Sequence, residues 1–526
     1  MSNLFKVSVA YGSGMGSSTT CRASLKTQPE LSCGSPNVEG GFCIAHHPSR
    51  MQLLIGAAAA GRVDLSGLEI TEDVVDDLRE LLVRDDMAPF ALDCSRCDFA
   101  SGARFPKTIF RGDVNVCAAS FGGAAEFNGS TFMGGVNFAN TQFVDAQFSS
   151  AHFCRKSNFN QCVFRKATFV GARFDDECVF DQTRWTTRVE FWDSFFGRAT
   201  SFEVVAFEDS ASFDRVTFSG VASFHRSEAA HWGFQRTTFG SDTRLGQTTS
   251  GAPIKLERVQ WPEASILDLK DAQVEILDSV ISEPLTVTST ATAIQNKVMA
   301  LDGPGTGTIT GLRSCVLMAS LTFTSAVNPA KTSFVGTTGL DKLRFFGAPG
   351  WQRTRTGRQV LHDDLSGVEP SVVEPMYREL RVGLEASKAS HAAADFYYGE
   401  LECRRREARP GSIDWILLPA YKWLGGYGVR AWRPFAWYVA VVLGTSMVFR
   451  YRTGWFVREP ELVGDGLSLS RYWDSVAIVG RSSVSFFNAP TAGLAAMGAI
   501  LLIAERFAAI SLLALAVVGL RSRVQR

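Results

Sequence analysis

The sequence predicts a parallel β-solenoid followed by α-helices and membrane-spanning segments. Phenylalanine recurs at every fifth or sixth position from Phe99 to Phe239, a small residue stands two positions before most of these aromatics, and two apolar runs lie near the C-terminus. The clearest part of the aromatic series comprises Phe121, Phe127, Phe132, Phe138, Phe143, Phe148, Phe153, Phe159, Phe164, Phe169, Phe174, Phe180, Trp185, Phe191, Phe196, Phe202, Phe207, Phe213, Phe218 and Phe224.

The aromatic spacing fits neither a helix nor a flat strand. A helix repeats every 3.6 residues and a strand every 2, so neither holds every fifth or sixth side chain on one inward line. A four-sided coil does, if each unit of five or six residues forms one side and its aromatic points to the axis. Such a coil has room for one large and one small inward residue per side. The small residues include Ala125, Ser130, Val136, Thr141, Ala146, Ala151, Ser157, Cys162, Ala167, Ala172 and Cys178.

This series resembles the pentapeptide-repeat family, whose units centre on Leu or Phe with Ala or Cys two residues earlier. The resemblance implies an all-β repeat solenoid, a right-handed quadrilateral parallel β-helix. With about 22 residues per coil and strands about 4.8 Å apart, Phe105 to Phe239 makes roughly six coils. The rings are predicted to be packing and not a cofactor site.

A Cys/His-rich leader, residues 1–50, carries a candidate metal site. Cys21, Cys33 and Cys43 precede His46 in the spacing C-x11-C-x9-C-x2-H. Three thiolates and one imidazole satisfy a tetrahedral zinc ion, and a closed set of four protein ligands makes zinc a structural cofactor, as in a zinc knuckle. His47 is an equal contender for the fourth ligand. The alternative is that these are incidental cysteines of a flexible leader.

Residues 51–95 are predicted to form a helical cap. Val63–Val83 reads as a strand-like turn and then an amphipathic helix, with Thr71 as its N-cap. A β-helix exposes unpaired backbone at its first coil, and an amphipathic helix covers it. Residues 96–240 then form the regular β-helix.

Cysteine usage indicates a reducing compartment. Cys94, Cys97, Cys162 and Cys178 stand in or beside the aromatic series, where a small apolar residue is wanted. Buried free thiols of this kind are typical of the cytosol. Met1–Thr20 has no continuous apolar core, so we expect no cleaved secretory signal.

The strict spacing fades after Phe239, but alternating β-rich segments continue. Residues 241–346 are therefore predicted to extend the solenoid with irregular turns, and a separate small β domain is the alternative. Residues 347–375 are polar and contain prolines, as expected of a linker. Residues 376–410 show two amphipathic patterns and predict a helical hairpin. Residues 411–433 are basic and aromatic, which is typical of a membrane interface.

Residues 434–526 predict a two-span transmembrane region, with buried soluble helices as the alternative. Pro434–Phe449 and Phe507–Leu520 are apolar runs. Two crossings return the chain to its starting side, so the positive-inside rule places the solenoid and the C-terminus in the cytoplasm of a multi-pass cell-membrane protein. The flanking basic residues are Arg404, Arg405, Arg406, Arg409, Lys422, Arg430 and Arg433 before the first run, and Arg521, Arg523 and Arg526 after the second.

Glu505 and Arg506 are charged residues inside apolar sequence, and a charge at membrane depth is a functional-site candidate. Adjacent helical residues point about 100° apart, so these two cannot pair well with each other. In one interpretation both lie at the outer interface and Thr491–Ala504 lies along the membrane. In the other, 472–504 is a re-entrant segment and Glu505–Leu520 is the inner helix of an oligomeric pore without a potassium-filter motif.

The order of these parts resembles a group of bacterial, especially actinobacterial, pentapeptide-repeat membrane proteins. The resemblance covers most of residues 95–526 and implies an architecture but no activity. It rests on Asp395–Arg406 (DFYYGELECRRR), Leu424–Trp437 (LGGYGVRAWRPFAW), Leu520–Arg526 (LRSRVQR) and Gly339–Phe345 (GLDKLRF).

Charge and motifs exclude several function classes. Phe99 to Phe239 contains 14 Lys or Arg and 14 Asp or Glu, whereas a DNA mimic needs a strongly acidic rod, so we expect no nucleic-acid partner. The chain has no P-loop, G-x-S-x-G or HExxH motif, so we expect no enzyme.

The predicted function is a membrane-anchored, non-catalytic protein-interaction scaffold on the cytoplasmic face. The alternative is an oligomeric membrane effector or channel-like pore gated by the cytosolic solenoid. The expected partners are the lipid bilayer, a protein that the sequence does not identify and, for the pore, further copies of this chain.

Overall fold

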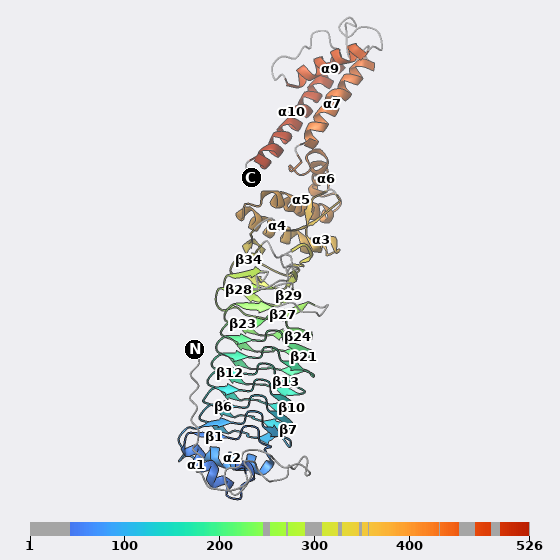
Figure 1. The fold of residues 1–526 in the computed structure, drawn as a ribbon. Coiled ribbons are helices and arrows are strands. Elements are labelled where there is room, and N and C mark those ends of the chain that lie inside the picture. Colours follow the sequence, from blue (N-terminus) through green and yellow to red (C-terminus); the bar gives the residue numbers. More distant parts are fainter. Residues whose placement is uncertain are drawn as a thin grey trace. The chain divides into compact units, whose positions relative to one another are not determined.

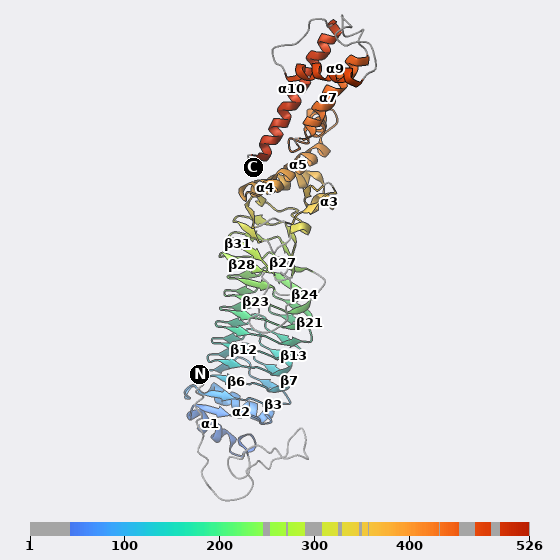
Figure 2. The same ribbon diagram turned by 45° about the horizontal axis from the view of Figure 1, so that its top comes forward.

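The structure is a computed structural model that describes residues 43–245, 253–269, 272–289, 308–324, 329–346, 350–355, 357–430, 432–451, 469–484 and 495–524. The chain divides into two compact units, Met1–Gly350 and Trp351–Arg526. The first unit is a β-solenoid and the second is mainly helical (Figures 1 and 2).

Parallel strands stacked along the solenoid form three long sheets. Sheet I contains β1 (Arg62–Asp64), β2 (Ala91–Asp93), β6 (Val114–Asn115), β9 (Val136–Asn137), β12 (Ser157–Asn158), β16 (Cys178–Val179), β20 (Thr200–Ser201), β23 (Ala222–Phe224), β26 (Thr243–Leu245), β28 (Ser265–Asp268), β31 (Leu285–Thr288), β34 (Leu321–Phe323) and β35 (Leu343–Phe345). Sheet II contains β3 (Asp98–Phe99), β4 (Ala103–Arg104), β7 (Ser120–Glu126), β10 (Gln142–Gln147), β13 (Val163–Phe164), β14 (Ala167–Thr168), β17 (Arg184–Trp185), β18 (Val189–Glu190), β21 (Ala206–Ser212), β24 (Glu228–Gln235), β27 (Ile254–Glu257), β29 (Gln273–Leu277) and β32 (Thr308–Arg313). Sheet III contains β5 (Ile109–Phe110), β8 (Thr131–Phe132), β11 (His152–Phe153), β15 (Arg173–Phe174), β19 (Phe195–Phe196), β22 (Thr217–Phe218) and β25 (Thr238–Phe239), and β30 (Val280–Ile281) pairs separately with β33 (Val316–Leu317).

Each turn of the regular solenoid has four sides. Phe138 stacks on Phe159 with ring centroids 5.1 Å apart, and three further inward phenylalanines stand between them in the sequence, one for each remaining side. The strand register pairs Phe174 with Phe196, so that a turn takes 21 or 22 residues. The predicted four-sided parallel coil is confirmed.

The core of the solenoid consists of stacked aromatic columns. Phe159 lies between Phe138 and Phe180, with ring centroids 5.1 and 4.8 Å away and ring planes within 15° of parallel. It meets Phe148 edge to face, at 84°. Stacked and edge-to-face pairs contribute about 0.5–1.5 kcal/mol each beyond the burial of their area. Phe159 is fully buried, so the rings are packing, as predicted.

The small inward residues also satisfy backbone carbonyls. The Thr141 hydroxyl donates to the Val116 carbonyl at 2.7 Å, and the Cys162 thiol donates to the Phe138 carbonyl at 3.0 Å. Both donors are completely buried, and each follows directly after a corner residue. Size explains why these positions hold small residues. The hydrogen bonds explain why Ser, Thr and Cys are used there as well as Ala.

Corners of the solenoid use left-handed backbone at regular intervals. Arg96, Lys107 and Ala118 have φ values of 58°, 55° and 58°, and the pattern continues along the rod. Asn140 tolerates this conformation well, whereas the β-branched Val204, at φ 59°, does not. The corner at Val204 is therefore strained.

Residues 51–95, predicted to form a helical cap, contain helices and also contribute β1 and β2 to sheet I. The short η1 (Ile44–His46) is followed by α1 (Arg50–Ala59), and α2 (Glu72–Val83) buries its apolar face. Arg50 joins the two longer helices through an ion pair with Asp77 at 2.5 Å. Thr71 occupies the N-cap position of α2, as predicted, and its side chain makes no capping hydrogen bond with the described backbone.

The irregular turns belong to the same solenoid. Strands β28, β31, β34 and β35 extend sheet I, and β27, β29 and β32 extend sheet II, which favours the predicted continuation over a separate β domain. Aliphatic columns replace the aromatic ones, as where Leu256, Ile276 and Leu312 stack while fully buried. The last turns also contain η2 (Pro329–Lys331) and η3 (Leu340–Lys342).

The second unit begins inside the segment predicted as a linker. There β36 (Gln352–Arg353) pairs antiparallel with β37 (Gln359–Val360), followed by α3 (His362–Leu365) and the start of α4 (Pro370–Ala386). Polarity alone did not reveal this folded structure, because its partners lie further along the chain. The predicted hairpin is formed by α4 and α5 (Ser390–Glu407). Gly399 permits their close approach, since a Cβ there would lie 2.6 Å from the Tyr377 ring.

The last helices are α6 (Ile413–Gly425), α7 (Trp432–Tyr451), α9 (Leu469–Val484) and α10 (Ala496–Val524), and α7 and α10 lie side by side (Figures 1 and 2). Their shared core contains Val442, Phe449, Val479 and Leu502. Among the described residues, one helix is long and apolar enough to cross a membrane, over Ala496–Val517. This differs from the two predicted spans, because the run at Phe507–Leu520 belongs to one continuous helix with the apolar residues before it, and α7 does not reach the same hydropathy.

Candidate functional site

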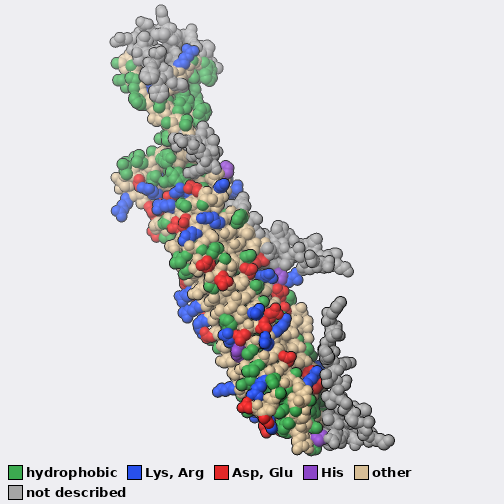
Figure 3. Space-filling view, turned by 90° about the vertical axis from the view of Figure 1, so that its left-hand side faces the viewer, with side chains coloured by type: hydrophobic (Ala, Val, Ile, Leu, Met, Phe, Trp, Pro, Cys, Tyr) green, Lys and Arg blue, Asp and Glu red, His purple; other side chains and the backbone are tan. Residues whose placement is uncertain are grey.

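Helices α6, α7 and α10 expose large apolar side chains. On α10, Ile500 is 62% exposed and Phe507 is 71% exposed, and Trp423 on α6 is 68% exposed. In Figure 3, hydrophobic side chains gather over part of the helical unit, whereas charges of both signs are interspersed over the solenoid face in view. Soluble proteins rarely expose apolar surface on this scale. The further exposed apolar side chains of these helices are Ile413, Trp415, Ile416, Leu417, Leu424, Trp432, Phe435, Trp437, Val439, Met447, Val448, Met497, Ile503 and Val517.

A pocket of about 480 Å³ opens between α6 and α7. Trp423, Trp432 and Trp437 line it together with Lys422 and Arg433. The Trp437 indole donates to the Trp423 carbonyl at 3.1 Å, and the Arg433 guanidinium donates to the Lys422 carbonyl at 3.0 Å, so the two helices hold each other at this point. Indole rings beside cations suit an anionic headgroup at a membrane interface.

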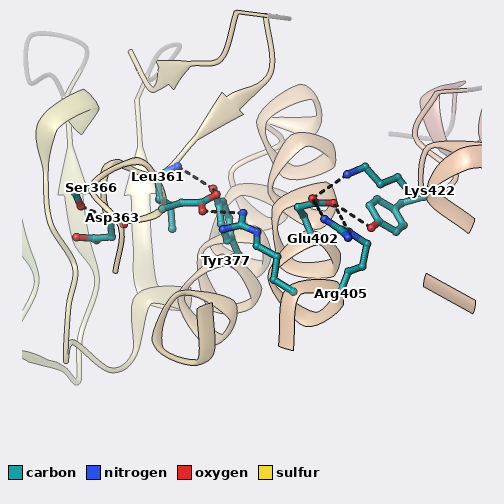
Figure 4. Close-up of polar contacts among 10 residues, drawn as sticks. Leu361, Asp363, Ser366, Tyr377, Glu402, Arg405 and Lys422 are labelled. Carbon is teal, nitrogen blue, oxygen red and sulfur yellow. Dashed lines mark hydrogen bonds and ion pairs between the residues drawn. The ribbon is translucent and has the colours of Figure 1, made fainter. Parts of the chain in front are cut away.

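One carboxylate ties α5 to α6 beside this pocket. Glu402 accepts hydrogen bonds from Arg405 at 2.8 Å and from Lys422 at 2.9 Å, and the Tyr427 hydroxyl donates to it at 3.1 Å (Figure 4). Burial by itself raises the pKa of Glu402, but these donors and cations outweigh it and lower the pKa to about 2. Two cations face one carboxylate, so the cluster stays cationic at neutral pH.

A second polar cluster joins α3 and the residue before it to α4 and α5. The Tyr377 hydroxyl donates to Asp364 at 2.9 Å and accepts from the Leu361 backbone N–H at 3.1 Å, and Arg406 donates to the other Asp364 oxygen at 2.9 Å (Figure 4). Burial and the Asp364 charge raise the pKa of Tyr377, which keeps the phenol neutral. These polar atoms satisfy one another, so we assign this cluster a structural role.

Glu505 lies in the middle of α10 and is 4% exposed. Neither of its carboxylate oxygens has a hydrogen-bond partner among the described residues. Arg506 instead donates to the carbonyl and the hydroxyl of Ser482 on α9, both at 3.1 Å. Arg506 therefore contacts α9 through hydrogen bonds, whereas Glu505 is buried without such a contact in the described part of the chain. Since α10 is continuous from Ala496 through both residues, they lie within the helix, whereas both interpretations began a new segment at Glu505. Their depth in a bilayer stays a prediction.

The candidate zinc ligands fall only partly in the described structure. Cys21 and Cys33 lie outside the described residues. Cys43 is buried, and its Sγ lies 3.2 Å from His46 Nδ1. His47 Nδ1 accepts a hydrogen bond from the Ser49 backbone N–H at 3.1 Å. Of the two contending histidines, His46 is therefore the one that faces Cys43.

Two sets of residues were not predicted as candidate sites. Glu402 collects its donors from three positions along the chain, and nothing in local sequence marks it. His152, Cys154 and Asp175 bring three donor atoms within 4.8 Å of one another on the solenoid. The available signal was a His-x-Cys alternation, His152 and Cys154 on either side of an inward phenylalanine, and an Asp one turn later.

In comparisons of the chain with protein-family models, with curated proteins and with solved structures, nothing matched. The resemblance to pentapeptide-repeat proteins therefore rests on the sequence pattern and the solenoid alone, and no comparison tests it. What the structure shows is a parallel β-solenoid with regularly stacked phenylalanines, followed by helices.

Proposed function

We propose that this protein is a membrane-anchored scaffold, in which the helical unit binds the lipid bilayer and the solenoid presents its faces to a protein partner at the cytoplasmic side. We further propose that the solenoid is a pentapeptide-repeat domain, because aromatic residues at the centre of each unit and small residues two positions earlier fill its interior. The solenoid is the display surface, since every turn offers outward side chains on rigidly spaced strands.

One observation carries the membrane proposal: the exposed apolar side chains of α6, α7 and α10. Burying such surface contributes about 25 cal/mol per Å², so leaving it in water is unfavourable. A hydrocarbon phase covers it without further protein. The exposed tryptophans concentrate on α6 and at the start of α7, which is typical of residues at the lipid–water boundary.

The proposal includes a second crossing by α7. Its 20 residues rise about 30 Å, the thickness of the hydrocarbon layer. It packs against α10 through Val442, Phe449 and Leu502, and it exposes Phe435 and Met447. With both helices crossing, the basic residues that precede or begin α7 and the basic residues of 521–526 lie on one side, which the positive-inside rule assigns to the cytoplasm.

Flotation of the full-length protein with vesicles tests the anchor. We expect the protein to float with phosphatidylcholine vesicles, to resist alkaline extraction, and to bind more strongly when phosphatidylglycerol is added. Arg433→Gln should remove most of the preference for the anionic lipid, because its guanidinium lines the pocket between α6 and α7. Arg353→Gln is the matched control at an exposed position of the same unit. Protein that stays in the aqueous fraction at every lipid composition would contradict the anchor.

Orientation and scaffolding need separate measurements. Protease added outside intact cells should leave the solenoid uncut, and cleavage there would contradict the cytoplasmic placement. Crosslinking in cells should recover a protein attached to the solenoid. Recovery of lipid and copies of this chain alone would count against the scaffold.

A second candidate function, an oligomeric pore or proton pathway, is favoured by Glu505. A buried carboxylate without a hydrogen-bond partner among the described residues is costly inside a membrane helix, and such groups commonly serve ion or proton movement. Conductance in planar bilayers tests it, with Glu505→Gln and Arg506→Ala expected to change the current. Silent bilayers at high protein loading would exclude the pore.

We also propose structural zinc at the N-terminal Cys/His set. The 3.2 Å separation of Cys43 Sγ and His46 Nδ1 suits two donors of one tetrahedral ion, for which about 3.5 Å is expected. Metal content of the purified protein should fall by one equivalent in the Cys21→Ser/Cys43→Ser double variant. Unchanged metal content would refute this site.

A further inference from the structure

A second metal site is suggested by side chains on the outer face of sheet III. His152 begins β11 and Cys154 follows that strand, so both side chains point outward on either side of the inward Phe153. Parallel pairing of β11 with β15 sets Phe153 beside Phe174, which places Asp175 next to Cys154 on the following turn. Three different donor types thus meet on one face.

The donor atoms lie close enough to share one ion. His152 Nε2 is 2.6 Å from Asp175 Oδ2 and 3.7 Å from Cys154 Sγ, and the three donors lie within 4.8 Å of one another. Around a tetrahedral zinc ion, neighbouring N, O and S ligands are about 3.3–3.5 Å apart. The His–Cys distance is close to this range, and the His–Asp pair needs to open by about 0.7–0.9 Å, because an ion takes the place of their hydrogen bond.

The backbone beneath the cluster is rigid. The rings of Phe153 and Phe174 stack with centroids 4.6 Å apart and planes 1° from parallel. Phe153 stacks equally well on Phe132 in the preceding turn, at 4.9 Å and 4°. Both rings are buried. The positions from which the three ligands project are therefore fixed by packing, which lowers the entropic cost of collecting them around an ion.

A neighbouring cation orients the carboxylate. Arg173 Nε lies 2.7 Å from Asp175 Oδ1, and its guanidinium covers the Phe195 ring at 4.4 Å. This contact occupies Oδ1 and leaves Oδ2 directed at His152. Metal-bound carboxylates are commonly held in this way by an outer partner. Thiolate and carboxylate together neutralise a divalent ion.

We propose that His152, Cys154 and Asp175 bind a divalent ion of the zinc type, and that the fourth coordination position is open to solvent. A mixed N, S and O donor set favours Zn²⁺ over Mg²⁺ or Ca²⁺, which prefer oxygen ligands alone. The side chains of His152 and Asp175 are 36% and 32% exposed, so water reaches the ion. Three protein ligands with an open position is the arrangement of zinc sites that bind a further ligand, in contrast to closed structural sites.

Cobalt titration of the metal-free, full-length protein in detergent tests this site. Co²⁺ should produce a thiolate-to-cobalt charge-transfer band together with the visible bands of a tetrahedral ion. The Cys154→Ser variant should lose the contribution of this site, and His152→Ala and Asp175→Asn should each weaken it at least tenfold. Arg173→Gln should weaken binding about tenfold through the orientation of Asp175.

Two controls distinguish this site from cobalt bound at the remaining cysteines of the chain. Cys117→Ser changes another half-buried cysteine of the solenoid and should leave the spectrum unchanged. Cys21→Ser/Cys43→Ser removes the N-terminal set and should remove a different equivalent of cobalt. The circular dichroism of Cys154→Ser should match the wild type, because the side chain lies outside the core. A spectrum that Cys154→Ser leaves intact, or one that the N-terminal variant abolishes completely, would overturn the proposal.

Discussion

The two units of this chain place their apolar side chains in opposite ways. In the solenoid the inward-facing aromatic residues of the regular turns are buried, and Phe159 and Phe202 have no exposed surface. In the helical unit Trp423 and Phe507 are each more than two-thirds exposed. Both units are rich in aromatic and aliphatic residues, so composition does not distinguish them.

The difference lies in how each unit covers its apolar side chains. The solenoid covers its own core with backbone and polar side chains, and the ion pairs on its surface are worth little individually. The last helices pack over a small shared core and leave apolar side chains outside. In the first unit the fold itself covers the inward apolar side chains. In the second, we propose that lipid covers the apolar side chains that the helices leave exposed.

The largest expected effect is in the aromatic core. Phe159→Ala should lower the free energy of unfolding of the surrounding turns by about 3–5 kcal/mol, because it leaves a cavity between two stacked rings. Native-state hydrogen exchange of the neighbouring strands measures this loss. Phe346→Ala is the control, because Phe346 is 70% exposed and should change stability by no more than about 0.5 kcal/mol. Equal effects at both positions would break the comparison.

On α10 the opposite pattern is expected. Phe507→Arg should leave the solenoid unchanged but should reduce membrane insertion by about 3 kcal/mol, because arginine is strongly disfavoured at the centre of a membrane helix. The fraction that resists alkaline extraction measures it. Phe346→Arg, an exposed aromatic of the solenoid unit, should extract as the wild type does. Full retention of Phe507→Arg would mean that this face of α10 does not contact lipid.

Acid should weaken the helical unit before the aromatic core. The folded-state pKa of Glu402, about 2, lies below its ordinary value of 4.5, so the carboxylate stabilises the fold above pH 4.5 and this stabilisation is lost as the pH falls through about 2. The contribution is roughly 2–3 kcal/mol. Amide exchange in α5 and α6 should rise over this range in the wild type. Glu402→Gln should start less protected and change less, and identical pH profiles would contradict the role of this carboxylate.

The smallest effect concerns a corner of the solenoid. Val204→Asn should stabilise the protein by about 1 kcal/mol or less, because asparagine tolerates the left-handed backbone that costs valine about 1–2 kcal/mol. The midpoint of thermal unfolding measures it. Val163→Asn is the control, since Val163 is similarly exposed but lies in strand β13 and should not be stabilised. A lower midpoint for Val204→Asn would show that the corner is not strained.

Much of the fold was predictable because one residue type repeats. The period of the phenylalanines determined the number of sides, and small residues such as Ala146 and Ala151 confirmed which positions face inward. The helical hairpin and the N-terminal cap followed from amphipathic patterns. The span count was less predictable, because hydropathy marks apolar runs without showing that residues 496–524 form one helix.

The sites were much less predictable. Glu505 was identified because a charge within apolar sequence stands out. The network of Glu402, Lys422 and Tyr427 joins residues that no local motif connects. The same is true of Cys154 and Asp175, which become neighbours only when the turn length and strand register are known.

The sequence by itself determined the solenoid. An aromatic residue that recurs every five or six positions can face inward each time only if the chain forms a coil whose sides have that length. Tertiary structure decided which outward side chains meet, because contacts on a solenoid face depend on register between turns. It also decided that the apolar residues of the last helices remain exposed, since hydropathy reports the character of a side chain and not whether another helix covers it.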